Sequence, residues 1–414
     1  MSTPDIRSTV GIIYSCATII ITAIWTILHL NVPGRGDSVT RVLFRRVRWG
    51  ILAVFAPDLL TMVAASQWLS ARKSVEQMKE LNGLDSWTMV HALYGNSGGF
   101  LLQLPDESAF LVNAECVHFL ASRGYIPVPT ITRNEIWDKS KSDLFAKGFA
   151  LLQIGWIIIQ SIARVVDGLS VSPLELFTLA FVVSTTMSYF FWWNKPQHVE
   201  TPTILHCKFS IAKILTDYGI PPDAPYVDSP LDFVQDSNKV WERRSFFREY
   251  DLERQMETNS RTRTRLQRIP DDAILPTRLP LHVLVMLVVP SLIHSGIHLL
   301  GWNFAYPSRI EQLLWRISAV ILTSVSAISL GMIRILAIFG YQGRYNLAWV
   351  WINFQRGEQR NRKFTKFWDV FLGLCILSLV TARFYIIVGA MISLRNLPAS
   401  VFVTVSWTDF FPHV

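Results

Sequence analysis

Seven long apolar segments restrict this sequence to folds in which helices can cross a membrane. Each segment approaches the length of about 20 residues that an α-helix needs to span the hydrocarbon core of a bilayer. The segments are residues 10–30, 50–69, 148–163, 174–183 with its aromatic end at 189–193, 281–300, 313–339 and 368–392. The sequence therefore predicts an all-α, polytopic helical membrane protein with about seven transmembrane helices.

The clearest of these segments form a hairpin at residues 148–193. Two apolar runs flank a short polar turn that contains Asp167, Gly168 and Pro173. The second run ends in a cluster of aromatic residues, Tyr189 to Trp193. Aromatic side chains gather at the interface between membrane and water, so this cluster indicates the end of a membrane span.

Composition supports a lipid environment and argues against nucleic acid as a partner. Half of the residues are apolar, with 15 Trp and 25 Phe, and the net charge is +8. The basic residues lie in loops beside apolar runs, a placement that anionic lipid headgroups explain. The four cysteines contain no C-x-x-C pair, so we expect neither a disulfide framework nor a metal site, and no cofactor.

Charge distribution divides the chain into five regions. They are an N-terminal membrane hairpin (residues 1–71), a cytosolic insert (72–147), a membrane hairpin (148–193), a basic cytosolic loop (194–280) and a three-helix membrane region (281–414). Lys and Arg concentrate in the loops after the second, fourth and sixth apolar runs, which places these loops in the cytosol and the C-terminus outside. We expect residence in the endoplasmic reticulum or another endomembrane.

The second apolar run leaves two topologies open. Pro57 and Asp58 interrupt its centre, and a basic patch precedes it. Seven complete spans would place this patch in the lumen, against the usual bias of positive charge toward the cytosol. Six spans plus a re-entrant or interfacial half-helix would place every basic loop in the cytosol.

Two charged residues lie deep within apolar runs, Asp58 in the second and Arg383 in the seventh. A charge in a membrane costs several kcal/mol, so it usually points into the helix bundle and has a partner. Asp58 and Arg383 could form a structural ion pair with each other, or they could form a substrate or proton site.

Other polar residues in the apolar runs have both a structural and a functional interpretation. Glu175 follows Ser172 and Pro173 in the pattern of a capping box, although a carboxylate there could also act in catalysis. Gln160 shares a helical face with Gln153, which predicts either packing or a lined pocket. His294 and His298 share a face at i, i+4 spacing, which suits a hydrogen-bonded pair better than a metal without a third ligand.

Two short motifs have weak support. Gly95-Asn96-Ser97-Gly98-Gly99 fits G-x-S-x-G, but the sequence around it does not predict the strand and helix of a nucleophile elbow. Asn134-Glu135-x-x-Asp138 is similar to part of the magnesium-diphosphate motif of membrane prenyltransferases. Its last acidic residue is displaced by one position, and the second motif of that family is missing.

The chain resembles a large family of fungal multi-pass membrane proteins. Members occur in natural-product gene clusters, and one is similar to the integral membrane cyclase of macrophorin-type meroterpenoids. The resemblance rests on Trp25-Thr26, His29 to Pro33, Ala56-Pro57-Asp58, Asp138 to Lys141 leading to Phe145-Ala146-Lys147, Leu174-Glu175-Leu176, Trp192 to Pro196, Trp407-Thr408 and Pro412-His413. It implies an enzyme that cyclises a terpenoid intermediate.

We therefore expect a cyclase that acts on a lipophilic terpenoid or polyketide without a redox cofactor. Ring closure would follow protonation by Asp58, kept neutral by its apolar surroundings, or a pericyclic step that needs only a shaped pocket. Arg383 would hold a substrate oxygen, and aromatic faces would stabilise cations. A transporter or channel and a membrane scaffold remain the alternatives. The predicted catalytic residues are Asp58, Arg383 and Glu175, and the predicted substrate-binding residues are Trp156, Gln160, Tyr189, Trp192, His294 and His298.

Overall fold

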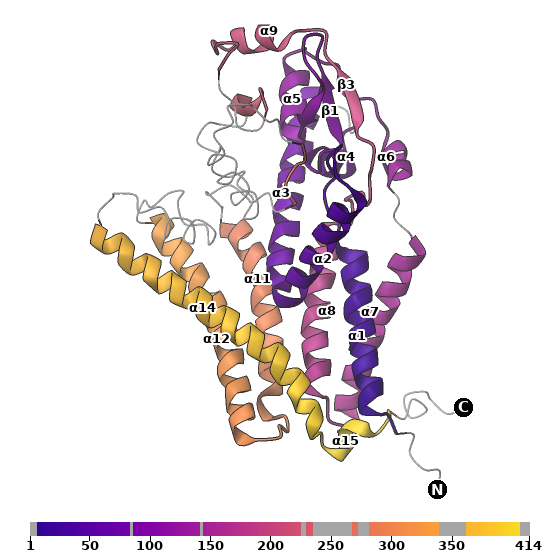
Figure 1. Ribbon diagram of the computed structural model, residues 1–414, viewed down its shortest axis with the longest axis vertical. Helices are drawn as coiled ribbons and strands as arrows, with labels where there is room; N and C mark the ends of the chain where they lie inside the picture. Colours follow the sequence, from indigo (N-terminus) through magenta and orange to yellow (C-terminus); the bar gives the residue numbers. More distant parts are fainter. Residues whose placement is uncertain are drawn as a thin grey trace.

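The computed structural model describes residues 6–82, 86–140, 144–224, 229–234, 267–271, 281–338 and 362–405. The protein is mostly helical, with a bundle of long helices below a smaller mixed region (Figure 1). Most of the predicted basic loop after residue 234 and the C-terminal motifs after residue 405 lie outside the described residues.

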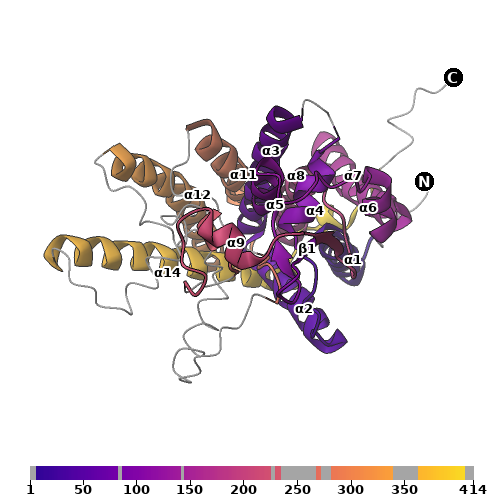
Figure 2. The same ribbon diagram turned by 90° about the horizontal axis from the view of Figure 1, so that it is seen from above.

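Every predicted apolar run contains or forms a helix of the bundle. The long helices are α1 (Thr9–Ile27), α2 (Val39–Phe55), α3 (Pro57–Asn82), α7 (Leu144–Val166), α8 (Pro173–Phe191), α11 (Leu281–Leu299), α12 (Arg309–Ile338) and α14 (Arg362–Ile392). Seen from above, α12 and α14 lie on the opposite side of the bundle from α7 (Figure 2). Short helices follow the long ones at η3 (Leu300–Asn303), η4 (Ser393–Arg395) and α15 (Ala399–Phe402).

Helix α8 is the centre of the bundle, because α1, α3, α7, α11 and α14 all pack against it. Its starting point is fixed locally. Ser172 caps the first turn, and Pro173 takes the first helical position, where a missing N–H costs nothing. Of the α8 span, 61% is buried inside the protein, against 33% of the α1 span. The outer helices therefore keep apolar faces that lipid could cover.

Three helices among the described residues are long and apolar enough to cross a membrane: Thr9–Ile27, Pro173–Phe191 and Gly373–Arg395. Helices α2 and α3 pass the same test only together, and they meet at a bend of 113°. The break falls at Ala56, directly before Pro57, because proline disfavours a helical conformation in the residue that precedes it.

The two ends of the described chain lie side by side. Ile6 and Val403 form an antiparallel bridge, and the Arg7 amide donates to the carbonyl of Phe402 at 2.8 Å. At the other end of α1, the Val32 amide donates to the carbonyl of Ser97 in the insert at 2.9 Å. An odd number of complete membrane crossings would place the two ends of the described chain on opposite sides of a membrane.

The prediction of an all-α fold was incomplete, because two strands of the insert form a small sheet with a strand of the following loop. Strands β1 (Phe100–Gln103), β2 (Phe110–Val112) and β3 (Thr203–His206) form a sheet in the order β2-β1-β3. The β1–β2 pair is antiparallel, and the β1–β3 pair is parallel. The helices of this region are α4 (Met89–Asn96), α5 (Ala114–Ser122), α6 (Arg133–Lys139), α9 (Ile211–Thr216) and η1 (Asp232–Val234).

The insert shares a hydrophobic core with the loop that follows residue 194, including Ile211 and Leu215, and α3 connects this core to the bundle. Trp87, Tyr94 and Phe100 are buried in this core, and the rings of Tyr94 and Phe100 meet edge to face at 5.0 Å. A Cβ atom at Gly99 would lie 2.5 Å from the Tyr94 ring, so only glycine allows this approach. Helix α3 continues past the predicted boundary at residue 71 and forms one wall of the core.

Candidate functional site

An ion pair joins Asp58 and Arg383 at the break between α2 and α3. Asp58 lies in the first turn of α3, and Arg383 lies on α14. The Arg383 Nη2 donates to Asp58 Oδ2 at 2.6 Å, and Nη1 donates to the carbonyl of Phe55 at 2.9 Å. Both side chains are only 10% exposed. The pair predicted as one alternative is present, and Arg383 contacts both sides of the break.

Helix α11 completes this centre with hydroxyl and imidazole groups. Ser291, which follows Pro290 inside the continuous helix α11, donates to Asp58 Oδ2 at 2.8 Å. His294 and His298 lie farther along the same helix, with ring centroids 5.0 Å apart. We call Asp58, Arg383, Ser291, His294 and His298 the Asp58 centre.

The histidine tautomers follow from their hydrogen bonds. His294 Nδ1 contacts the carbonyl of Ala180 at 3.2 Å, and His298 Nδ1 contacts the carbonyl of His294 at 3.0 Å. A carbonyl oxygen only accepts, so the proton lies on Nδ1 in both rings. The Nε2 atoms of the neutral rings are therefore proton acceptors.

The Asp58 centre contains buried polar atoms that could bind a ligand. Within the described parts of the chain, Asp58 Oδ1, Arg383 Nε, His298 Nε2 and the Ser295 hydroxyl have no hydrogen-bond partner. Buried polar atoms are normally satisfied, so such a group needs an explanation. A polar substrate atom would satisfy them. No group of three metal-ligating side chains occurs among the described residues.

Glu175 holds the opposite end of the bundle together. Its Oε2 accepts from the Ser172 amide at 2.9 Å and from the Ser172 hydroxyl at 2.8 Å, which confirms the capping box. Arg7 forms an ion pair with the same carboxylate. Arg164 is buried nearby, and it donates to the carbonyls of Ser170 and Val401. These contacts give Glu175 a structural role and account for both of its oxygens.

The predicted aromatic residues divide between two places. Trp156 is 51% exposed on α7, and Gln160 is half-buried on the same helix, which packs against α1 and α8. Tyr189 and Trp192 instead lie at the far end of α8, where both rings contact His29. These four residues are therefore divided between α7 and the C-terminal end of α8.

A second polar centre surrounds Lys195, which the sequence analysis did not select. Its ammonium group donates to Asn31 Oδ1 and Gln67 Oε1, both at 2.8 Å, and lies 5.0 Å from the Trp192 ring centroid. Burial lowers the pKa of Lys195 to about 7. Trp192 Nε1 also donates to Gln67 Oε1 at 3.0 Å. In the sequence, a lysine after an aromatic cluster is typical of an interfacial anchor, so it gave no signal of burial.

The segment 267–271 docks onto this second centre. The Asp271 carboxylate accepts from the Asn31 amide at 2.7 Å and from Arg268 at 2.9 Å, and it lies 3.7 Å from Arg45 Nε. Gln67 Nε2 donates to the Asp271 carbonyl at 2.8 Å. We call Asn31, Arg45, Gln67, Lys195 and Asp271 the Lys195 centre. Gln67 and Asp58 both lie on α3. At a rise of about 1.5 Å per residue, they are roughly 13 Å apart along the helix axis.

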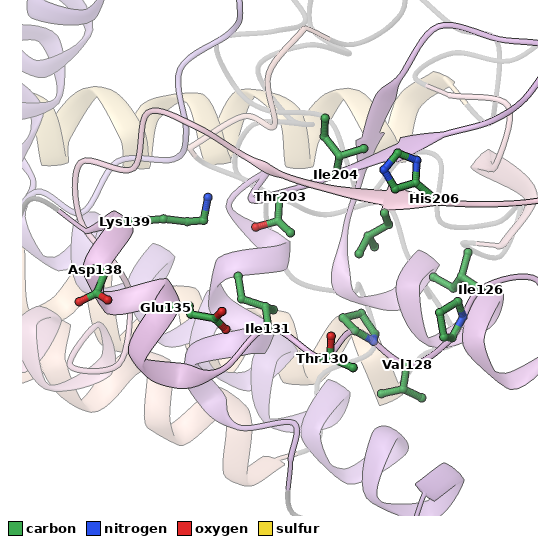
Figure 3. Close-up of a pocket in the computed structure, with 13 residues that line it drawn as sticks. Ile126, Val128, Thr130, Ile131, Glu135, Asp138, Lys139, Thr203, Ile204 and His206 are labelled. Carbon is green, nitrogen blue, oxygen red and sulfur yellow. The ribbon is translucent and has the colours of Figure 1, made fainter.

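A groove of about 650 Å³ lies on the insert, between β3 and the segment 126–131 (Figure 3). Glu135, Asp138 and Lys139 of α6 line one end of the groove. The Thr132 amide donates to Glu135, and the two residues form a capping box. The residues similar to the prenyltransferase motif thus begin a short helix outside the bundle. Ser97 also has a local role, because it follows helix α4 and precedes a strand, the reverse of a nucleophile elbow.

Comparisons with known proteins identify a family but no function. No curated protein and no solved structure matches this chain. The model of a family described as "Family of unknown function (DUF8562)" matches residues 1–216 and 281–414. Every residue of the Asp58 centre lies within the matched ranges, as do all members of the Lys195 centre except Asp271. The match covers most of the sequence, and the chain therefore belongs to the DUF8562 family.

Proposed function

We propose that this chain is a multi-pass endomembrane protein with six crossings and a re-entrant α2–α3 pair. The three candidate spans, the 113° bend and the pairing of Ile6 with Val403 support this topology. The bias of Lys and Arg places the insert in the cytosol and both ends of the chain in the lumen. Membrane lipids would then cover the exposed apolar faces of the outer helices.

Within this topology, we propose that the Asp58 centre is the active site of a cofactor-free cyclase. The substrate would be a lipophilic terpenoid or polyketide intermediate of fungal secondary metabolism. The observation that carries the proposal is a charged pair buried in an apolar bundle beside unpartnered Asp58 Oδ1 and His298 Nε2. Ionisable residues in such positions are costly, and they usually mark a substrate or proton path.

The ion pair changes the expected role of Asp58. A guanidinium at 2.6 Å stabilises the carboxylate form, so apolar surroundings alone do not keep Asp58 protonated. In the proposed reaction, a substrate oxygen binds Arg383, and Asp58 takes up a proton. Asp58 then protonates an alkene, the cation closes the ring by forming a C–C bond, and His298 Nε2 removes a proton from a neighbouring carbon. His298 then releases this proton to water, which also supplies the proton that Asp58 takes up, so the sum is an isomerisation without oxidant or reductant. A pericyclic closure would need only a shaped pocket and would not use the Asp58 proton.

The test is a metabolite comparison followed by a microsomal assay. Deleting the gene in its host should lead to accumulation of an uncyclised precursor, and microsomes that contain the protein should convert it. Asp58→Asn should lower conversion at least 100-fold by removing the proton donor. Glu76→Gln, which removes a carboxylate that is 63% exposed, should retain full activity. Full activity of Asp58→Asn would eliminate the proton-donor mechanism, and unchanged metabolites on deletion would eliminate the cyclase.

The break between α2 and α3 favours a transporter as the second candidate. Transporters place binding sites at interrupted helices near the middle of the membrane, and Arg383 contacts both halves of this break. A transporter would leave the metabolite profile intact and change solute uptake in the deletion strain. Uptake that Arg383→Met abolishes and Arg316→Met preserves would support this candidate.

A further inference from the structure

Among the residues that the structure describes, the Lys195 centre contains more positive than negative charge, although it is buried. The side chains of Lys195 and Asp271 are almost fully buried, and Arg45 is only 7% exposed. Arg268 also contacts Asp271, so three cations share one carboxylate. Farther out, Asp37 and Arg48 add one charge of each sign, which leaves the excess unchanged. A buried excess of positive charge is costly unless an anion compensates it.

The guanidinium of Arg45 is only partly hydrogen-bonded in this centre. Its Nη2 donates to the carbonyl of Asn31 at 2.9 Å. Its Nη1 and Nε have no hydrogen-bond partner in the described part of the chain, and Nε reaches Asp271 only at 3.7 Å. An arginine presents five donors in a planar fork that fits a tetrahedral or planar oxyanion. This arginine is therefore incompletely satisfied by the carboxylate beside it.

The Asp271 carboxylate occupies the position that a bound anion would take. It accepts a backbone N–H from Asn31, directly after α1, and it faces Arg45. Its segment is fixed by two further contacts, from Gln67 to the Asp271 carbonyl and from Asn31 Nδ2 to the Pro270 carbonyl, both at 2.8 Å. The receptor residues lie within the ranges that the family model matches, whereas residues 267–271 lie in the stretch between them.

We propose that Asn31, Arg45 and Lys195 form an anion-binding site for a phosphate monoester group, and that Asp271 occupies this site as an internal stand-in. A phosphate dianion balances the charge of the two cations, Arg45 and Lys195, better than a single carboxylate does. The site opens when residues 267–271 leave, so this segment competes with the phosphate group. The group could belong to a lipid headgroup or to a soluble phosphate, because both present the same oxygens. This proposal is independent of the chemistry at the Asp58 centre.

The first experiment measures phosphate-dependent thermal stability of the full chain in detergent. Inorganic phosphate should raise the Tm of Asp271→Asn at concentrations at least tenfold lower than for the wild type, since the competing charge is gone. Adding Arg45→Gln to Asp271→Asn should abolish the rise. The matched controls are Glu76→Gln and Arg72→Gln. They remove the same kinds of charge from an exposed ion pair on α3. Equal phosphate responses in Asp271→Asn and Glu76→Gln would overturn the proposal.

A second measurement uses only the wild type, in case Asp271→Asn does not fold. Saturating phosphate should increase hydrogen exchange in residues 267–271, because the anion displaces this segment. Unchanged protection there would also contradict the proposal. Nanodiscs distinguish the two sources of phosphate. If the lipid is the source, discs with 10% phosphatidic acid in phosphatidylcholine should reproduce the displacement, and pure phosphatidylcholine should not. If the source is soluble, only added phosphate should do so.

Discussion

Replacing Arg383 by methionine should be among the most destabilising single substitutions in the bundle. The change leaves the Asp58 carboxylate buried, with Ser291 still donating to Oδ2 and Oδ1 without a partner. Removing one member of a buried ion pair costs about 3–5 kcal/mol, because the other charge stays uncompensated. Asp58→Asn in the same chain removes that charge, so the double variant should lose only about 1–2 kcal/mol.

The assay is a double-mutant cycle on the free energy of unfolding, measured by denaturant titration in one detergent. The control is Arg316→Met on α12. Arg316 donates to the carbonyl of Trp302 at 2.8 Å and has no carboxylate partner among the residues described, so its loss should cost less than about 1 kcal/mol. The reasoning fails if Arg383→Met costs no more than Arg316→Met, or if the effects of Asp58→Asn and Arg383→Met simply add.

Three further predictions concern other parts of the chain. Folded Lys195 loses its proton near pH 7 while the unfolded lysine keeps it to about 10.5, so the Tm should rise with pH above about 7. Lys195→Met should remove this rise, whereas Lys73→Met, at an exposed position, should not. An unchanged rise in Lys195→Met would show that Lys195 is not its source. Glu175→Ala should cost about 1–2 kcal/mol in unfolding free energy and speed proteolysis at the N-terminus, whereas Gln at this position should retain the cap. Gly99→Ala should cost about 1–3 kcal/mol from overlap with a tyrosine ring. Gly155→Ala, with nothing within 4 Å, should stabilise by about 0.5–1 kcal/mol, and equal effects at both glycines would refute the packing argument.

The helices of the bundle and the pairing of Asp58 with Arg383 were accessible from sequence, because both follow from the cost of placing polar groups in apolar surroundings. The contact of Ser291 with Asp58 was not predicted. Long apolar runs predict helices, and a buried Asp58 requires a partner such as Arg383. The Glu175 cap was also predictable, since a capping box is a local pattern of four residues. The choice between seven spans and six spans plus a half-helix depended on the angle of the break before Pro57. Hydropathy alone does not predict this angle.

The sheet and the Lys195 centre could not be predicted, because both depend on contacts between distant segments. Strand β3 has only four residues, and its partner β1 lies before the entire α7–α8 hairpin. Asn31, Gln67 and Lys195 each lie at or near the end of an apolar run, where a polar residue usually faces water. Nothing local distinguishes a polar residue that faces solvent from one that closes a buried network.

The parallel pairing of β1 with β3 sets an order of events during synthesis. The β3 strand leaves the ribosome only after both helices of the α7–α8 hairpin, so the insert cannot complete its sheet from its own residues. Until then, the edge of β1 that β3 will cover stays open to other chains. Under the proposed topology, insertion of the hairpin into the bilayer would return β3 to the side of the membrane on which β1 lies. Closure of the sheet would then require both helices of the hairpin to have entered the membrane in the correct orientation.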